Sequence, residues 1–236
     1  MEKKDVGKNC YKSGLEIEKL MRDAMGLDKF IDVHRKFGEA GLGRSLTAYF
    51  ILRKEGISIR KIREQELALV LKWRTDPDIS KYMKSDFRAT LEMQKQWYAD
   101  VQKDNSKRYW MIEIDSVPVG VICLTDMDYN LKTCEWGYYI AEKAQRSFAA
   151  AVSIECSLYD YVFQELGFQK IYCECLSFNT GVIKLHEYCG NHIDEIKKDE
   201  VVKNGDSFDL VLMSIRAEEW NKKRKEFSYN RILFSS

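Results

Sequence analysis

A histidine and an asparagine seven residues apart have the clearest positional argument for chemistry in this sequence. Asn179 precedes segment 180–188, which is patterned as a helix, so its side-chain oxygen can cap free N–H groups there. His186 lies two helical turns further on and hence on the same face. An imidazole titrates near neutrality and can donate a proton or a hydrogen bond. The alternative interpretation is a helix-surface or satisfied core histidine.

Two glutamates on strand-like segments are candidate proton acceptors, because a carboxylate can take the proton of an amine. Glu135 and Glu174 lie in two separate segments of this kind, and Glu174 stands between two cysteines. Since side chains alternate along a strand, Glu174 faces oppositely to Cys173 and Cys175. The alternative interpretation of each glutamate is a solvated carboxylate on a strand face.

A turn between a strand and a long helix, at residues 145–151, is a candidate phosphate site. The first turn of a helix exposes unpaired backbone N–H groups at the positive end of the helix dipole. The alternative interpretation is a helix start with good alanine propensity and no ligand. The turn consists of Gln145, Arg146, Ser147, Phe148, Ala149, Ala150 and Ala151.

The elements that must position these side chains form a mixed α/β pattern. Strands are expected at 57–62, 109–114, 119–124, 134–140 and 170–176, with a hairpin turn at 115–118 and closing strands around 204–205 and at 208–215. Helices are expected at 64–74, broken by Asp76-Pro77, and at 91–103, 148–166 and 180–188. The apolar stripe of the helix at 148–166 needs a sheet to pack on.

Three parts are expected along the chain. Residues 1–56 are rich in charge and helix formers and predict a helical extension of unknown role. Residues 57–220 form the α/β domain, and residues 221–236 form a C-terminal tail. The extension is open to interpretation as a helical cap, a dimer arm or the end of a fused upstream domain.

Composition limits the classes to which the protein can belong. The 236 residues are 45% hydrophobic and 32% charged, which suits one globular domain with an appendage. Lys+Arg 38 against Asp+Glu 37 lacks the basic excess expected of a nucleic-acid binder. No apolar run reaches the roughly 20 residues of a membrane span, and no secretory signal opens the sequence. We therefore expect a cytoplasmic protein without nucleic-acid or membrane partners.

The cysteines favour neither a disulfide framework nor a metal site. There are 7, an odd and scattered set that lies mostly in apolar segments, as reduced buried thiols do. The close pair Cys173 and Cys175 has no second pair or neighbouring histidine cluster in the sequence to complete four zinc ligands. We expect no metal.

Four collinear features resemble the GNAT superfamily of acetyl-CoA-dependent N-acetyltransferases, over about residues 57–220. They are LKWRTDPDI at 71–79, CEWGYYI at 134–140 with its following turn at 145–151, LSFNTGVIKLHEYCG at 176–190, and KNG at 203–205 with FDLVLM at 208–213, ending at 218–220. The first is similar to a segment of the branch that acetylates amino-sugar nucleotides or ribosomal-protein N-termini. The closest resemblance is to enzymes that acetylate the C4 amine of UDP-4-amino-4,6-dideoxy-N-acetylaltrosamine in pseudaminic acid synthesis.

This resemblance implies a fold, a cofactor and roles. It implies the GNAT acyltransferase fold, a mixed and mostly antiparallel sheet flanked by helices, and direct transfer of acetyl to a primary amine. His186 stands where the family usually has the tyrosine that protonates the departing CoA thiolate, and Glu174 and Glu135 stand where a carboxylate can act on the amine. The expected acetyl-CoA contacts are Tyr139, Ile140, the turn Gln145, Arg146, Ser147, Phe148, Ala149, Ala150 and Ala151, and also Asn179 and Lys184.

The resemblance also assigns residues to the pocket that binds the acceptor amine. Arg74, Met83, Trp97 and Arg108 stand in segments that help build this pocket in the sugar-nucleotide branch, and Glu135 is a further expected contact with the acceptor. Helix packing is an equal explanation for Trp97. The expected partner is a small-molecule amine, and a homodimer is possible. Alanine for the family's glycine at Ala149, and histidine for tyrosine at His186, also fit a GNAT-shaped protein that has lost catalysis.

Overall fold

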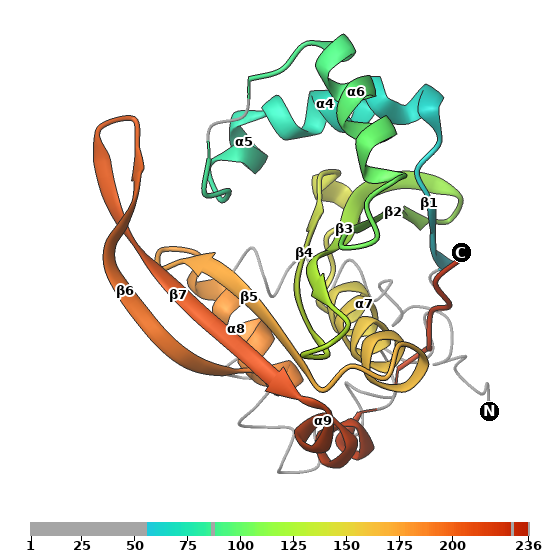
Figure 1. Ribbon diagram of the computed structural model, residues 1–236, viewed down its shortest axis with the longest axis vertical. Coiled ribbons are helices and arrows are strands. Elements are labelled where there is room, and N and C mark those ends of the chain that lie inside the picture. Colours follow the sequence, from blue (N-terminus) through green and yellow to red (C-terminus); the bar gives the residue numbers. More distant parts are fainter. Residues whose placement is uncertain (1–55, 86–87, 228, 236) are drawn as a thin grey trace, which may run out of the picture.

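Seven strands form one mixed sheet within the part of the chain that the structure describes, residues 56–85, 88–227 and 229–235 of the computed structural model (Figure 1). Their order in the sheet is β1-β2-β3-β4-β5-β7-β6. The strands are β1 Ile57–Lys61, β2 Arg108–Ile114, β3 Val117–Asp128, β4 Thr133–Ile140, β5 Lys170–Leu176, β6 His192–Lys203 and β7 Asp206–Arg216. The expected N-terminal extension lies outside the described residues, apart from Gly56.

Helices cover both faces of this sheet, as the mixed α/β pattern predicts. They are α4 Leu67–Thr75, α5 Pro77–Ser80, α6 Leu91–Val101, α7 Phe148–Asp160, α8 Thr180–Cys189 and α9 Ala217–Lys223. Side chains alternate along β2 and β3, so Trp110 and Ile122 join the core under α7 and α8, whereas Met111 and Val121 join a second core under α4.

The centre of the sheet opens where β4 and β5 meet. These two strands pair in parallel through Thr133↔Lys170, Cys134↔Ile171 and Glu135↔Tyr172, and the pairing stops there. The other neighbouring strands of the sheet pair antiparallel. Figure 1 shows β4 and β5 diverging beyond their paired ends. Beyond this point the backbone N–H and C=O groups on the facing edges of β4 and β5 do not pair with each other and need other partners.

Several element boundaries differ from the expectation. Asp115 and Ser116 alone form the first hairpin turn, with φ of 52° and 66°, and Pro118 lies inside β3. Pro118 is tolerated there because the register shifts by a bulge opposite it. The helix expected at 148–166 is an α-helix only to Asp160 and continues as a π-helical turn, Tyr161–Glu165. The expected tail boundary at residue 220 falls inside α9.

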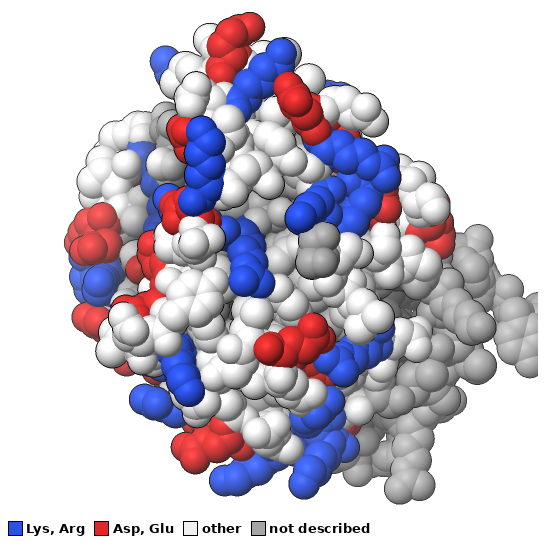
Figure 2. Space-filling view, turned by 45° about the vertical axis from the view of Figure 1, so that its right-hand side comes forward, with Lys and Arg blue, Asp and Glu red and all other residues white. Residues whose placement is uncertain are grey.

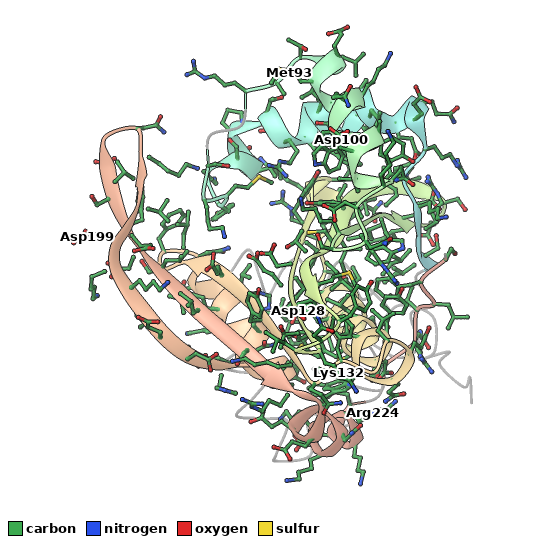
Figure 3. The ribbon with its side chains drawn as sticks, in the orientation of Figure 1. Met93, Asp100, Asp128, Lys132, Asp199 and Arg224 are labelled. Atoms are coloured by element: carbon green, nitrogen blue, oxygen red, sulfur yellow. The ribbon has the colours of Figure 1, made fainter. Side chains whose placement is uncertain are left out.

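The surface around the sheet carries charged side chains of both signs and the outlying helix α6. Basic and acidic side chains are interspersed on the face seen in Figure 2, in keeping with the formal net charge of +1. Figure 3 shows Met93 and Asp100 on α6, which lies beside α4 and away from the opening between β4 and β5. No helix of the described residues is long and apolar enough to cross a membrane.

The end of the chain packs back onto β1. Phe234 forms a parallel bridge with Ile59, and the N–H of Ser235 donates to the Ile59 carbonyl at 3.0 Å. The Phe234 ring stacks on Tyr161 at a centroid distance of 4.6 Å and lies 5.1 Å from the Trp110 ring. The final residues therefore extend the edge of the domain's sheet.

Replacing Phe234 with alanine is expected to lower the free energy of unfolding by about 1–2 kcal/mol, because two aromatic contacts are lost. Urea denaturation monitored by circular dichroism measures this. Leu233→Ala is the matched control, since that side chain is 70% exposed, and we expect its midpoint to equal that of the wild type. Equal midpoints for all three proteins would show that the end of the chain contributes nothing to stability.

Candidate active site

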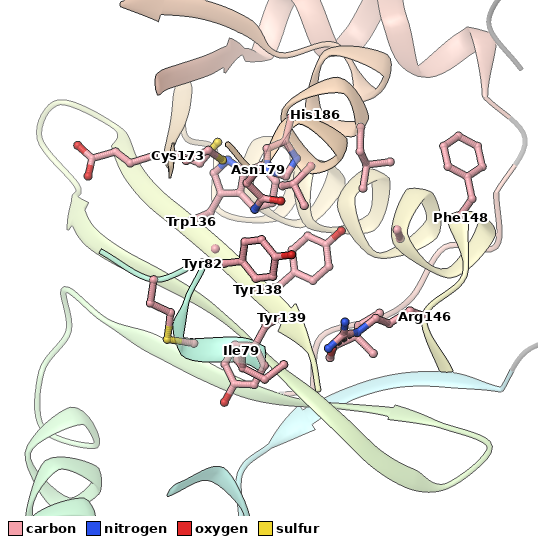
Figure 4. A pocket seen from close by; sticks show the side chains of 18 of the residues that line it. Ile79, Tyr82, Trp136, Tyr138, Tyr139, Arg146, Phe148, Cys173, Asn179 and His186 are labelled. Atoms are coloured by element: carbon pink, nitrogen blue, oxygen red, sulfur yellow. Dashed lines mark hydrogen bonds between the residues drawn. The ribbon is translucent and has the colours of Figure 1, made fainter. Parts of the chain in front are cut away.

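A cavity of about 360 Å³ lies at the opening between β4 and β5 (Figure 4). Its walls come from α5 and the residues after it, the second half of β4, the start of α7, the end of β5 and the inner face of α8. In Figure 4, Asn179 and His186 lie together at one end, and Arg146 lies toward the other, near β4. The fold therefore brings the sequence-predicted strand, turn and helix residues to one hollow.

The turn before α7 is tied to the end of β4. The Arg146 guanidinium donates to the carbonyls of Ile140 and Ala141 at 2.7 and 3.2 Å. Ser147 is the N-cap of α7, and its Oγ accepts from the N–H of Ala150 at 2.9 Å. This uses one of the backbone donors that the sequence offered to a phosphate, so Ala150 supports the turn from inside.

Phe148 is accommodated by packing beneath the turn. Its side chain is buried, and the ring lies edge to face with Tyr188 of α8 at a centroid distance of 5.2 Å. Phe148, Ser147, Arg146 and Ala151 line the cavity, as do Tyr139 and Ile140 of β4. Gln145, Ala149, Ala150 and Lys184 do not line it.

Asn179 differs from its expected structural role. It is the N-cap of α8, but its side chain makes no capping hydrogen bond, and its backbone carbonyl accepts from Val182 and Ile183 at 3.1 Å each. The amide lines the cavity instead. The capping expectation was wrong because the backbone at Asn179, with φ of −81° and ψ of 52°, lies outside the extended region typical of side-chain caps.

His186 lies at the inner end of the cavity in a buried polar network. Its Nδ1 lies 2.9 Å from Oε1 of Glu155, a fully buried residue of α7. Glu155 also accepts hydrogen bonds from the hydroxyls of Tyr138 and Tyr159, each at 3.0 Å. Nδ1 is thus engaged with the carboxylate, and the ring also hydrogen-bonds to the side chain of Cys175, which lines the cavity.

This network sets the charge of the imidazole. Burial disfavours the imidazolium, but the Glu155 carboxylate and the Cys175 side chain outweigh it and raise the pKa of His186 to about 10. The ring also lies 4.8 Å from the Trp136 ring. At neutral pH, His186 is therefore held protonated by Glu155 and Cys175 at the inner end of the cavity.

Two cysteines of β5 lie next to His186. The Sγ atoms of Cys173 and Cys175 and a ring nitrogen of His186 all lie within 4.8 Å of one another, although the sequence showed no histidine near this pair. A hydrogen bond from Cys173 lowers the pKa of Cys175 to about 5 against the effect of burial, with help from His186. Three donors fall short of the four ligands of structural zinc sites, and we assign no metal to them.

The opposite face of β4 and β5 carries carboxylates, as alternation predicts for Glu174. Lys84, which follows α5, forms an ion pair with Glu174 and lies 3.5 Å from Oε1 of Glu135. Burial raises the pKa of Glu135, which Lys84 opposes and Glu174 increases. Glu174 lines the cavity, and Glu135 adjoins it through Lys84. The structure thus places the His186 imidazole on one side of the strand opening and a carboxylate pair on the other.

The expected acceptor residues are separated by the fold. Met83 lines the cavity, whereas Arg74 does not. Trp97 of α6 packs edge to face on Tyr109 at 4.9 Å and lines a different depression. Arg108, on β2, donates to the Tyr161 hydroxyl at 2.6 Å on the far side of the sheet.

Two charged side chains at this site were not predicted from the sequence. Glu155 lies three residues after Val152 and four before Tyr159, so a carboxylate on the apolar stripe of the helix was the available signal. Lys84 gave none, because its partners are residues 135 and 174, far away in the sequence.

Comparison with known proteins decides the family. Residues 57–192 match the acetyltransferase (GNAT) domain family. The chain belongs to this family. As a GNAT acetyltransferase it has the expected fold and is an N-acetyltransferase that uses an acyl-CoA donor, which confirms the expectation from the four sequence features.

This GNAT chain is similar to several named acetyltransferases and to a solved acetyltransferase structure. It is 27% identical over 143 residues to acetyltransferase PseH of Campylobacter jejuni, covering 59% of this chain and 84% of that protein. It is 25% identical to the prophage-derived N-acetyltransferase YokL of Bacillus subtilis, covering 70% and 93%. The Vibrio cholerae spermidine N-acetyltransferase, solved with CoA and spermine, superposes with a TM-score of 0.66 at 22% identity, covering 70% and 98%.

Proposed function

We propose that the protein transfers acetyl from acetyl-CoA to the primary amine of a small molecule, and that this amine is the C4 amine of a UDP-amino-dideoxysugar. The observation that carries the proposal is the arrangement at the strand opening, with protonated His186 on one face and the Glu135 and Glu174 carboxylates on the other. An amine that enters from the carboxylate side can be deprotonated there, and His186 lies across the strands, where it can protonate the leaving thiolate.

The cavity suits the donor substrate. Acetyl-CoA supplies a thioester carbonyl for attack and a thiolate that must be protonated. The backbone of β4 faces the cavity at Gly137 and Tyr138, Asn179 turns its amide into it, and Arg146 and Ser147 border it at the start of α7. We assign the pantetheine arm to the β4 edge and Asn179, and the diphosphate to the turn before α7.

Protons are accepted on one side of the strand opening and donated on the other. Glu174 and Glu135 take the two protons that the acceptor's ammonium loses as it becomes an amide, and the raised pKa of Glu135 favours this role. Backbone N–H groups of β4 polarise the carbonyl. His186 gives its proton to the leaving sulfur, and Glu155 holds the ring and balances its charge. Attack is direct, and no acyl-enzyme is required.

Aromatic side chains at the cavity mouth support a nucleotide acceptor. Tyr82 lines the cavity, and its ring lies 5.8 Å from Phe178, which lies 5.2 Å from Phe208. Tyr82 and Phe178 are about two-fifths exposed, which leaves faces on which a base can stack. The PseH relatives add a second reason for a nucleotide-sugar amine.

Steady-state assays of CoA release test the proposal with three acceptors: UDP-4-amino-4,6-dideoxy-N-acetylaltrosamine, a ribosomal-protein N-terminal peptide and spermidine. We expect the highest kcat/KM with the sugar nucleotide. Transfer to the peptide alone would favour the ribosomal-protein type of Nα-acetyltransferase, and transfer to spermidine alone would show that the carboxylate pair selects a polycation.

A catalytically impaired GNAT-like binding protein is the alternative from another class, since Ala149 and His186 depart from the family pattern. Calorimetric titration with acetyl-CoA separates the two. Absence of both heat and thermal stabilisation at high acetyl-CoA concentration would overturn the transferase proposal.

A further inference from the structure

Lys84 places a primary amine of the protein between the two carboxylates at the strand opening. Its Nζ pairs with Glu174 and lies 3.5 Å from Glu135, and its neighbour Met83 lines the cavity. The ammonium of a substrate needs the same partners. Lys84 is therefore a primary amine of the chain itself, held at the position expected for the acceptor's ammonium.

The segment that carries Lys84 is anchored on several sides. Lys203, at the end of β6 and only 6% exposed, donates through Nζ to the carbonyls of Ser80 and Met83, each at 2.8 Å. Asp78 of α5 forms an ion pair with Lys143, and Tyr82 contacts the Phe178 ring. The segment that carries Lys84 is thus held beside the carboxylates by contacts other than the lysine's own ion pair.

The charges around Lys84 match those that the proposed reaction requires. Burial lowers the pKa of Lys84, but Glu174 and Glu135 outweigh it, so the amine rests as an ammonium. Glu135 in turn has a raised pKa through burial, Glu174 and Asp126, so it is suited to receive a proton. The Lys84 side chain is 47% exposed, and ion pairs of such exposure contribute little, so an acceptor can displace it.

We propose that Lys84 is an acetylation site of the enzyme itself, modified by its own acetyl donor when no acceptor amine is bound. The inference rests on the proposed function. One ammonium proton passes to the Glu135 and Glu174 pair, and the amine nitrogen attacks the thioester carbonyl. A C–N bond forms and the nitrogen gives its second proton to the same carboxylate pair, the C–S bond breaks, and the leaving thiolate takes a proton from His186. The product is an uncharged Nε-acetyl-lysine and free CoA.

Acetylation changes the acceptor site. An acetylated Lys84 can no longer neutralise Glu174 and Glu135, so the carboxylate pair becomes free for the ammonium of an acceptor. The unmodified enzyme must spend binding energy on displacing Lys84. Self-acetylation is therefore expected to lower KM for the acceptor without changing the groups that perform the transfer.

Mass spectrometry of the full chain after incubation with acetyl-CoA, without acceptor, tests the proposal. We expect one added acetyl group, mapped by peptide analysis to Lys84, at a rate per molecule that does not depend on protein concentration. Glu174→Gln is expected to slow the modification by about 100-fold, and excess acceptor amine is expected to suppress it. Lys81, on the same segment and 51% exposed in its side chain, is the internal control and is expected to stay unmodified.

Two variants of the chain sharpen the test. Lys84→Arg removes the acetylation and keeps the positive charge, whereas Lys84→Gln mimics the acetylated side chain. We expect Lys84→Gln to have a lower acceptor KM than Lys84→Arg. Lys81→Arg should behave as the wild type in both assays.

The outcomes separate this inference from the proposed function. A chain that binds acetyl-CoA and acetylates an added amine but leaves Lys84 unmodified overturns the self-acetylation alone. Equal labelling of Lys81 and Lys84, or labelling that Glu174→Gln does not slow, shows uncatalysed chemical acetylation and overturns it too. A chain that does not bind acetyl-CoA overturns the proposed function and this inference together.

Discussion

Replacing His186 with phenylalanine is expected to lower kcat for acetyl transfer by about 10²–10⁴-fold, the usual contribution of a positioned general acid. The imidazolium is the group that faces the cavity with a proton to give, and its charge is sustained by Glu155 on the opposite side of the ring. Affinity for CoA should change much less, because the turn before α7 and the edge of β4 are untouched. Steady-state kinetics and calorimetry on the same variant measure the two effects.

The pH dependence of kcat distinguishes proton donation from a packing role for this ring. The pKa of His186 is raised to about 10, so the donor form is present at neutral pH and is lost as the pH rises through that value. We expect wild-type kcat to fall on this basic side and His186→Tyr to retain more activity than His186→Phe, since a phenol can also donate. His192→Phe is the matched control, because that ring is half exposed on β6. A His186→Phe enzyme with unchanged kcat would exclude the imidazole from the reaction.

Local periodicity was enough to predict which side chains share a face. Asn179 and His186 both line the cavity because seven residues of helix return to the same side. Glu174 lies opposite its two buried cysteine neighbours because strands alternate. These are consequences of backbone geometry within single elements, so the sequence contains them.

Contacts between distant elements were beyond the sequence. The pairing of His186 with Glu155 joins α8 to α7 across 31 residues, and no spacing rule connects them. The same holds for Lys84, whose role depends on a segment held by the distant hairpin through Lys203. A histidine whose pKa is expected near neutrality from its type alone becomes a strongly basic group only in this tertiary setting.

The altered turn before α7 shows how a departure from a family pattern can be absorbed. A side chain as bulky as that of Phe148 could obstruct the start of the helix. Its ring instead fills space against Tyr188 and helps fix α8 beside α7. The Phe148 ring therefore links the turn before α7 to the helix that carries His186.

Replacing Glu155 with alanine is expected to lower the free energy of unfolding by about 3–5 kcal/mol, the range for removing one partner of a buried ion pair. The carboxylate is fully buried and accepts from two tyrosine hydroxyls besides contacting His186. Its removal leaves three polar groups without their common partner in the core. Chemical denaturation monitored by tryptophan fluorescence at neutral pH measures the loss.

Glu155→Gln separates the charge of this residue from its volume. The amide keeps the shape but cannot balance an imidazolium, so we expect a smaller loss of stability and a His186 pKa well below that of the wild type. In the wild type the pKa is raised on folding, so the stabilisation is fully present below the unfolded value near 6.5 and is lost as the pH rises toward about 10. Denaturation curves across this range should converge for wild type and Glu155→Gln at the basic end. If the stability difference between the two proteins stays constant with pH, the His186–Glu155 pair is not charged in the folded state. A group other than His186 must then protonate the leaving thiolate.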